Sequence, residues 1–213
     1  MNHCQTMRLL TDTGLETQAI ALQALDHIDS QYSTSGDPRQ NAAAELYLPY
    51  HNGRHTRFVL QDIRILRNVV GLTPAEYDVA ISAGSAHDVV QELDAKAGEN
   101  EDNSAGWLAD KMADQPDAFT KTEIDYAQLA ILGTKTIVDM FFELKQRATM
   151  QDYPSKRAEL IAHVVAAADP GRLYTPDGPL NAHLLFQEQH TGGSGQPPSL
   201  DDFYTFQKRQ LQF

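Results

Sequence analysis

The apolar residues of this chain recur mostly at helical spacing, and no segment shows the sustained apolar–polar alternation of a half-buried strand. The clearest pattern lies in residues 51–70, where five positions fall on one helical face: His55, Val59, Ile63, Leu66 and Val70. We therefore expect an all-α fold. A length of 213 residues, 41% of them hydrophobic, suits one domain with a substantial core.

Capping signals predict where several helices begin. Thr73 and Glu76 enclose Pro74 in a capping box, which predicts a helix that starts there and runs to about residue 93. Ser155 caps a later helix that Pro170 should stop. Apolar spacing predicts further helices over residues 15–30, 41–48, 51–70, 103–113 and 122–148, the last as one or two helices.

These segments predict a bundle of six to eight helices in a single domain, residues 1–191. The sequence GGSGQPP over residues 192–198 is typical of a flexible linker, and residues 199–213 form a short C-terminal tail.

The net charge of −12 disfavours nucleic-acid polymers and anionic membranes as partners. The sequence contains no run of eighteen apolar residues, so we expect no membrane-spanning helix. The N-terminus becomes polar too early for a secretory signal. The single cysteine, Cys4, excludes an internal disulfide and suits a reducing compartment. We expect a cytoplasmic location.

Two histidines stand four residues apart in the segment YHNGRHTRFV. His51 and His55 would lie on one helical face, because four residues leave an angular offset of only about 40°. His55 also shares the stripe that we assign to the core. A buried histidine needs a hydrogen-bond partner or a metal, so this pair alone leaves both interpretations open.

A second polar pair, His87 and Asp88, follows four small residues, Ala-Gly-Ser-Ala, at 83–86. Small side chains would let another helix or a ligand approach closely. Neighbouring side chains on a helix diverge by about 100°, so both could reach one ion only if it lay against the helix between them. An imidazole with a carboxylate suits Zn, Mn, Fe or Mg.

Together these motifs resemble those of the HD superfamily of metal-dependent phosphohydrolases. The resemblance covers roughly residues 41–170 and rests on three blocks: Tyr50-His51-Asn52 with His55 and Val59, then Ala86-His87-Asp88-Val89, then Asn100-Glu101-x-x-Ser104-Ala105. The third block is similar to an element of one bacterial branch of predicted HD phosphohydrolases. The first is also similar to the Y-H-N-x-x-H segment of cyclic-nucleotide phosphodiesterases.

The resemblance implies an HD-like helical bundle and a role for each matching residue. It implies His55, His87 and Asp88 as ligands of one divalent ion (Mn, Mg, Fe, Zn or Ni), with Asp88 also catalytic. It implies His51 as a proton donor to the leaving oxygen.

The fourth ligand that the superfamily requires is a downstream aspartate. Asp169 is our candidate, although Pro170 stands where the related sequences usually carry leucine. Asp139 is the reserve choice. Related proteins often have a histidine shortly after a Thr-Lys pair that helps to bind a second metal, and none follows Thr134-Lys135 here. One ion is therefore expected.

Three further residues are candidates with simpler alternatives. Lys135 and Arg54 could bind substrate phosphate, or could be ordinary surface cations. Glu101 could orient a ligand or a water, or could merely be an acid favoured at a helix start.

We therefore expect a metal-dependent phosphohydrolase that uses a metal-activated water on a small phosphorylated compound, with nucleotides among the candidates. The sequence does not choose between a phosphomonoester and a phosphodiester. The first alternative is a regulatory HD module that binds a metal or nucleotide with little or no turnover, and the second is a helical scaffold without metal. A homodimer is an open alternative to a monomer.

Overall fold

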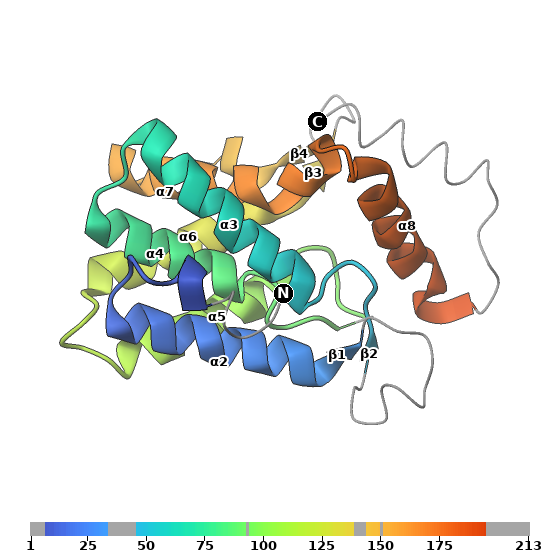
Figure 1. Ribbon diagram of the computed structural model, residues 1–213, viewed down its shortest axis with the longest axis horizontal. Coiled ribbons are helices and arrows are strands. Elements are labelled where there is room, and N and C mark those ends of the chain that lie inside the picture. The colour runs from blue at the N-terminus through green and yellow to red at the C-terminus, as the bar shows by residue number, and fades with distance from the viewer. Residues whose placement is uncertain (1–6, 34–45, 93, 139–143, 150, 195–213) are drawn as a thin grey trace.

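The computed structural model describes residues 7–33, 46–92, 94–138, 144–149 and 151–194, and these contain seven α-helices, α2 to α8. The expected all-α bundle is confirmed (Figure 1). Two pairs of very short strands accompany the helices. The parallel pair joins β1 (Tyr32–Ser33) to β2 (Leu46–Tyr47), and the antiparallel pair joins β3 (Thr136–Val138) to β4 (Leu144–Gln146).

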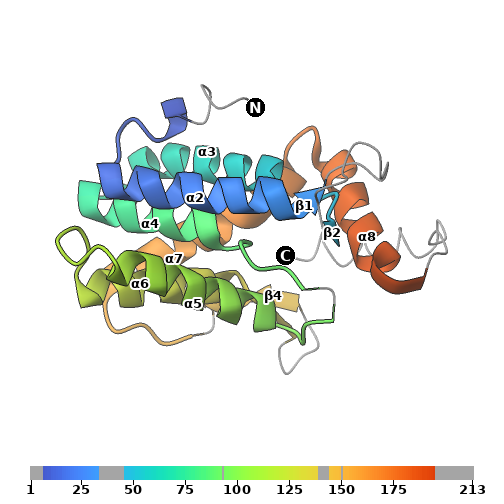
Figure 2. The ribbon, with the colours of Figure 1, turned by 90° about the horizontal axis from the view of Figure 1, so that it is seen from below.

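Helix α4 (Pro74–Ala86) is the centre of the bundle, and ten of its thirteen residues are buried. It contacts five other helices: α2 (Leu15–Gln31), α3 (Gly53–Val70), α5 (Glu99–Ala113), α6 (Lys121–Thr134) and α7 (Lys156–Ala168). Figure 2 shows α2 and α3 on one side of α4, and α5 and α6 on another. Helix α4 is therefore enclosed on nearly every side.

Small residues in α4 allow this close packing. A Cβ atom at Gly84 would overlap Cδ1 of Ile63 on α3, which shows how closely these two helices approach. The run of small residues at 83–86 was expected to permit such an approach, and a neighbouring helix occupies it.

The capping box of Thr73 and Glu76 forms as expected, with each side chain accepting a hydrogen bond from the other's backbone N–H. At its other end, α4 stops at Ala86 and does not continue to about residue 93. The prediction of that end was wrong, and His87 and Asp88 lie where the chain leaves the helix. The later residues turn away because groups from α5 and from Tyr32 bind their backbone.

Other boundaries also differ from the expectations, and α5 begins at Glu99 where the sequence suggested residue 103. Helix α3 begins at Gly53, so His51 precedes it. Leu46 and Tyr47 form β2 where the sequence suggested a helix over 41–48, and residues 34–45 lie outside the described ranges. The segment 122–148 contains α6, then the β3–β4 pair, then a 3-10 turn, η1 (Arg147–Thr149). Strands of two or three residues are too short to produce a recognisable alternation.

Ser155 caps α7 as expected, and α7 ends at Ala168, just before Pro170. The 3-10 helix η2 (Asp169–Tyr174) then leads into α8 (Gly178–Ser194). Helix α8 thus includes the first residues of the predicted linker. The rest of that linker and the predicted tail lie outside the described residues.

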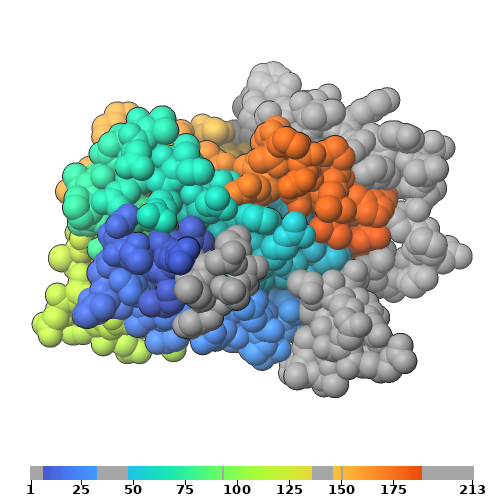
Figure 3. Space-filling model, viewed as in Figure 1, coloured from blue at the N-terminus to red at the C-terminus, as the bar shows by residue number. Residues whose placement is uncertain are grey.

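Helix α8 lies at one end of the bundle, beside η2 (Figures 1 and 2). It packs through a satellite cluster of buried residues, separate from the main core, that consists of Tyr50, Ala182, Leu185 and Phe186. In the space-filling view, α2 and α3 form one broad face with the η2 and α8 region beside them (Figure 3). None of the described helices has the length and apolar character to cross a bilayer.

Candidate metal centre

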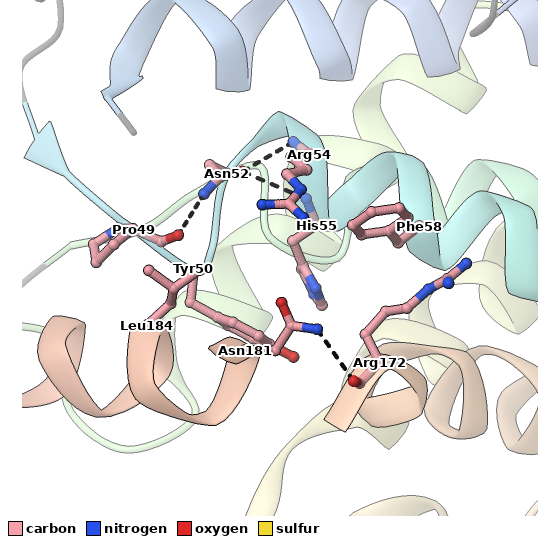
Figure 4. A pocket seen from close by; sticks show the side chains of 9 residues that line it. All are labelled: Pro49, Tyr50, Asn52, Arg54, His55, Phe58, Arg172, Asn181 and Leu184. Atoms are coloured by element: carbon pink, nitrogen blue, oxygen red, sulfur yellow. Dashed lines mark hydrogen bonds between the residues drawn. The ribbon is translucent and has the colours of Figure 1, made fainter. Parts of the chain in front are cut away.

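Two separate segments provide the three residues of the candidate centre. His55 comes from the first turn of α3, where the side chain of Asn52 accepts hydrogen bonds from the N–H groups of Arg54 and His55 (Figure 4). His87 and Asp88 stand at the end of α4. Because α3 and α4 pack closely, the first histidine of one helix faces the last residues of the other.

The side chains of His55, His87 and Asp88 form a buried group that could hold a metal ion, with all three ligand atoms within 4.8 Å of one another. The two Nε2 atoms are 3.2 Å apart. Oδ2 of Asp88 lies 2.9 Å from Nε2 of His87 and 3.4 Å from Nε2 of His55. All three atoms thus converge on one point.

The hydrogen bonds around the centre orient the atoms that converge, and Nε2 of His55 lies 3.2 Å from both Nε2 of His87 and Oδ1 of Asp169. Nδ1 of His87 lies 2.9 Å from the carbonyl oxygen of Gly84, which can only accept, so the neutral ring, the form that binds a metal, carries its N–H on Nδ1 and its lone pair on Nε2. Oδ2 of Asp88 is buried and has no hydrogen-bond partner among the described residues. An unpartnered carboxylate oxygen facing a lone pair is unfavourable unless a cation or a proton lies between them.

The electrostatics agree with a strongly anionic centre. Burial acts to lower the pKa of His87, but the carboxylates of Asp88 and Asp169 raise it well above its ordinary value. Burial acts to raise the pKa of Asp88, yet the neighbouring histidines lower it to about 2. The carboxylate is therefore ionised at neutral pH, as a metal ligand must be.

Asp169, the candidate fourth ligand, lies beside this group. Its Oδ1 atom is 3.2 Å from Nε2 of His55 and 3.6 Å from Nε2 of His87. It opens η2, immediately before Pro170, so the proline occurs where α7 already ends. The neighbouring histidines lower the pKa of Asp169 despite its burial. Asp139, the reserve choice, lies outside the described residues.

His51 does not belong to the cluster of three. It is half-buried, and its Nδ1 contacts Oε1 of Glu188 on α8. Oε2 of Glu188 accepts hydrogen bonds of 2.9 Å from the N–H groups of Tyr50 and His51. Burial acts to lower the pKa of His51, but Glu188 and the more distant Asp88 raise it to about 10. His51 is therefore a cation at neutral pH.

The two candidate phosphate contacts have protein partners. Nζ of Lys135 is buried and lies 2.6 Å from Oδ1 of Asp102. The guanidinium of Arg54 lies over the ring of Phe58, 5.3 Å from its centroid, and Arg172 lies at 4.3 Å from the same centroid. Figure 4 shows Arg54, Phe58 and Arg172 around a small pocket that His55 also lines.

A larger cavity of about 430 Å³ opens beside the candidate centre. Asp88 and His51 both line it, and so does Glu101. Burial and the nearby Asp88 raise the pKa of Glu101. Lys96 also lines this cavity, whereas Lys135 is not among the lining residues.

Two residues of the site were not predicted from the sequence. Gln91 donates a hydrogen bond to Oδ1 of Asp88, and Glu188 binds His51. Gln91 is only three residues from Asp88, so its proximity could have been noticed. Glu188 is separated from His51 by 137 residues, and no local pattern connects them.

Comparisons with protein-family models, with curated proteins and with solved structures gave no match.

Proposed function

We propose that this chain is a metal-dependent phosphohydrolase of the HD type that acts on a small phosphorylated compound, with nucleotides among the candidate substrates. The observation that supports this most is the convergence of His55, His87 and Asp88 within 4.8 Å, next to a cavity of about 430 Å³. The donor atoms and the cavity together provide a place for an ion and for a substrate.

The donor set fits a divalent cation. Two imidazole nitrogens with one or two carboxylates are typical ligands of Mn, Fe, Zn or Ni. His55, His87 and Asp88 would hold the ion, with Asp169 as the fourth ligand. A divalent cation bound there would lower the pKa of coordinated water and neutralise charge on phosphoryl oxygens.

We assign the protonation of the departing oxygen to His51. Its Nδ1 is engaged by Glu188, so Nε2 is the atom that can present a proton to a departing oxygen. The pKa of about 10 keeps His51 protonated at neutral pH, which a proton donor needs. Because His51 and Asp88 line the same cavity, a phosphate near Asp88 would also be near His51.

The proposal is tested by metal analysis together with activity assays. Purified protein is analysed for bound metals and assayed with Mn²⁺ or Mg²⁺ against p-nitrophenyl phosphate, bis(p-nitrophenyl) phosphate and nucleotides. We expect turnover that is lost in His87→Ala and Asp88→Ala. The control is Asp125→Asn, which removes an exposed carboxylate paired with Lys121 and should leave turnover unchanged.

A regulatory module that binds a metal or nucleotide without turnover is the second candidate. The observation that favours it is the ion pair of Lys135 with Asp102, because this lysine is then not free to bind phosphate. Bound metal with no turnover on the whole panel would support the module. Absence of bound metal, with no binding of added cations or of nucleotides, would refute both candidates and favour a helical scaffold.

A further inference from the structure

A chain of side-chain amides leads from Asp88 to the backbone of the loop that follows it. Nε2 of Gln91 donates a hydrogen bond of 3.0 Å to Oδ1 of Asp88. Oε1 of Gln91 accepts one of 3.2 Å from Nδ2 of Asn100 on α5. Oδ1 of Asn100 accepts one of 3.0 Å from the N–H of Glu92. We call these three hydrogen bonds the amide relay.

The direction of the amide relay is fixed by its last member. A backbone N–H can only donate, so the atom of Asn100 that faces Glu92 must be its oxygen. The NH₂ group of Asn100 then faces Gln91, which must present its own oxygen in return. Gln91 consequently directs its NH₂ group at Asp88, and no other orientation satisfies every member.

The same loop is held by a second residue of α5. Oγ of Ser104 accepts a hydrogen bond of 3.1 Å from the N–H of Val90. Asn100 and Ser104 are four residues apart and so lie one turn apart on the same face of α5. Helix α5 thus binds the loop at two points. Of these two residues, Asn100 is the one that is linked to the carboxylate of Asp88, through Gln91.

The two oxygens of Asp88 have different surroundings as a result. Oδ1 is bound by Gln91, whereas Oδ2 has no hydrogen-bond partner in the described part of the chain and faces the two histidine nitrogens. A carboxylate held by one oxygen cannot rotate without breaking that bond. Its other oxygen is then directed in advance towards the point where the ligand atoms converge.

We propose that Gln91 and Asn100 are positioning residues that orient Asp88 for cation binding. Groups that hydrogen-bond to metal ligands commonly change metal affinity about 10- to 100-fold when they are mutated. This inference rests on the proposed cation site but does not depend on which substrate is hydrolysed, or on whether any is.

The first test replaces Gln91 with methionine, which has a similar length and neither an amide donor nor a carbonyl acceptor. Affinity for Mn²⁺ is measured by calorimetry without substrate, and folding is checked by the thermal transition of the metal-free protein. We expect the Kd for Mn²⁺ to rise by about 10-fold or more. A Kd equal to that of the wild type, in a variant that folds normally, would overturn the proposal.

The second test reverses the amide relay. In Asn100→Asp, one carboxylate oxygen still accepts from the N–H of Glu92, but the donor to Gln91 is lost. Gln91 should turn its NH₂ group towards position 100 and its oxygen towards Asp88, which weakens cation binding. The added negative charge by itself should strengthen cation binding, so the two effects have opposite signs.

Asn103→Asp is the matched control, because Asn103 is exposed on the same helix and the chemical change is identical. We expect Asn100→Asp to raise the Kd for Mn²⁺ and Asn103→Asp to leave it unchanged or lower it slightly. Equal effects of both changes would contradict the amide relay. If the wild type binds no Mn²⁺, Zn²⁺ or Ni²⁺, the proposed function is refuted. In that case, crystal structures of the wild type and of Gln91→Met test the amide relay. An unchanged orientation of Asp88 in Gln91→Met would refute its positioning role.

Discussion

Replacing Glu188 with glutamine removes one negative charge from the contact that joins α8 to the segment before α3. The two backbone hydrogen bonds to Oε2 can persist, because the amide oxygen of glutamine also accepts. The lost component is the charge-assisted contact with His51. Hydrogen bonds to charged groups contribute about 1.5–3 kcal/mol, so we expect α8 to lose about 2 kcal/mol of local stability.

The pH dependence of this loss follows from the two pKa shifts. His51 has a pKa of about 10 in the fold against 6.5 ordinarily, so its contribution is complete below pH 6.5 and disappears as pH rises through 10. Glu188 has a pKa below its ordinary 4.5, so its contribution is complete above pH 4.5 and disappears as pH falls through the folded value. The difference between wild type and variant should be largest between pH 4.5 and 6.5.

Hydrogen exchange of metal-free protein, kept so with a chelator, measures this effect. A loss of 2 kcal/mol corresponds to about 30-fold faster exchange of α8 amides. We expect that acceleration at pH 5.5 and a clearly smaller one at pH 9, with α4 amides much less affected. Asp125→Asn, which removes an exposed ion pair with Lys121, should change exchange very little. An acceleration of α8 that is equal at both pH values would refute the reasoning.

Two further predictions concern helix packing and Lys135. Gly84→Ala places a methyl group against Cδ1 of Ile63. Overpacking of this kind costs about 1–3 kcal/mol, whereas the higher helix propensity of alanine gains about 1 kcal/mol. We therefore expect the unfolding free energy to fall by about 1 kcal/mol. Adding Ile63→Val removes Cδ1. In urea unfolding, the double variant should then lose less unfolding free energy than the two single variants together. Additive losses would contradict the contact. Lys135→Met should lower stability through loss of its contact with Asp102 and leave the KM of any hydrolysed substrate unchanged, and a large rise in KM would instead support a phosphate contact.

The beginnings of α4 and α7 were predicted correctly, whereas the end of α4 was not. Thr73 and Ser155 act within one turn of their own position, so local sequence contains the information. The end of α4 depends on Asn100, Ser104 and Tyr32, which bind the backbone of the following loop from other elements. A local pattern in 87–93 cannot reveal contacts made from α5.

In the candidate site, too, local sequence patterns predicted some positions, and contacts from distant segments determine others. The helical stripe through His55 predicted that this side chain faces the core, and the structure buries it beside His87. The expected difficulty that neighbouring side chains diverge on a helix does not arise, because α4 ends before Asp88. The partner of His51 could not be predicted, since the contact with Glu188 depends on the packing of α8 against Tyr50.

The candidate ligands are far apart along the chain, since His55 and Asp169 are 114 positions apart. An unfolded chain does not hold such residues together, so a cation that needs all of them would bind the native state almost exclusively. Free cation at 100 times its Kd would then stabilise the protein by about 2.7 kcal/mol. The supply of divalent ions would then shift the folded fraction of the protein, and withdrawing them would expose more of it to proteolysis.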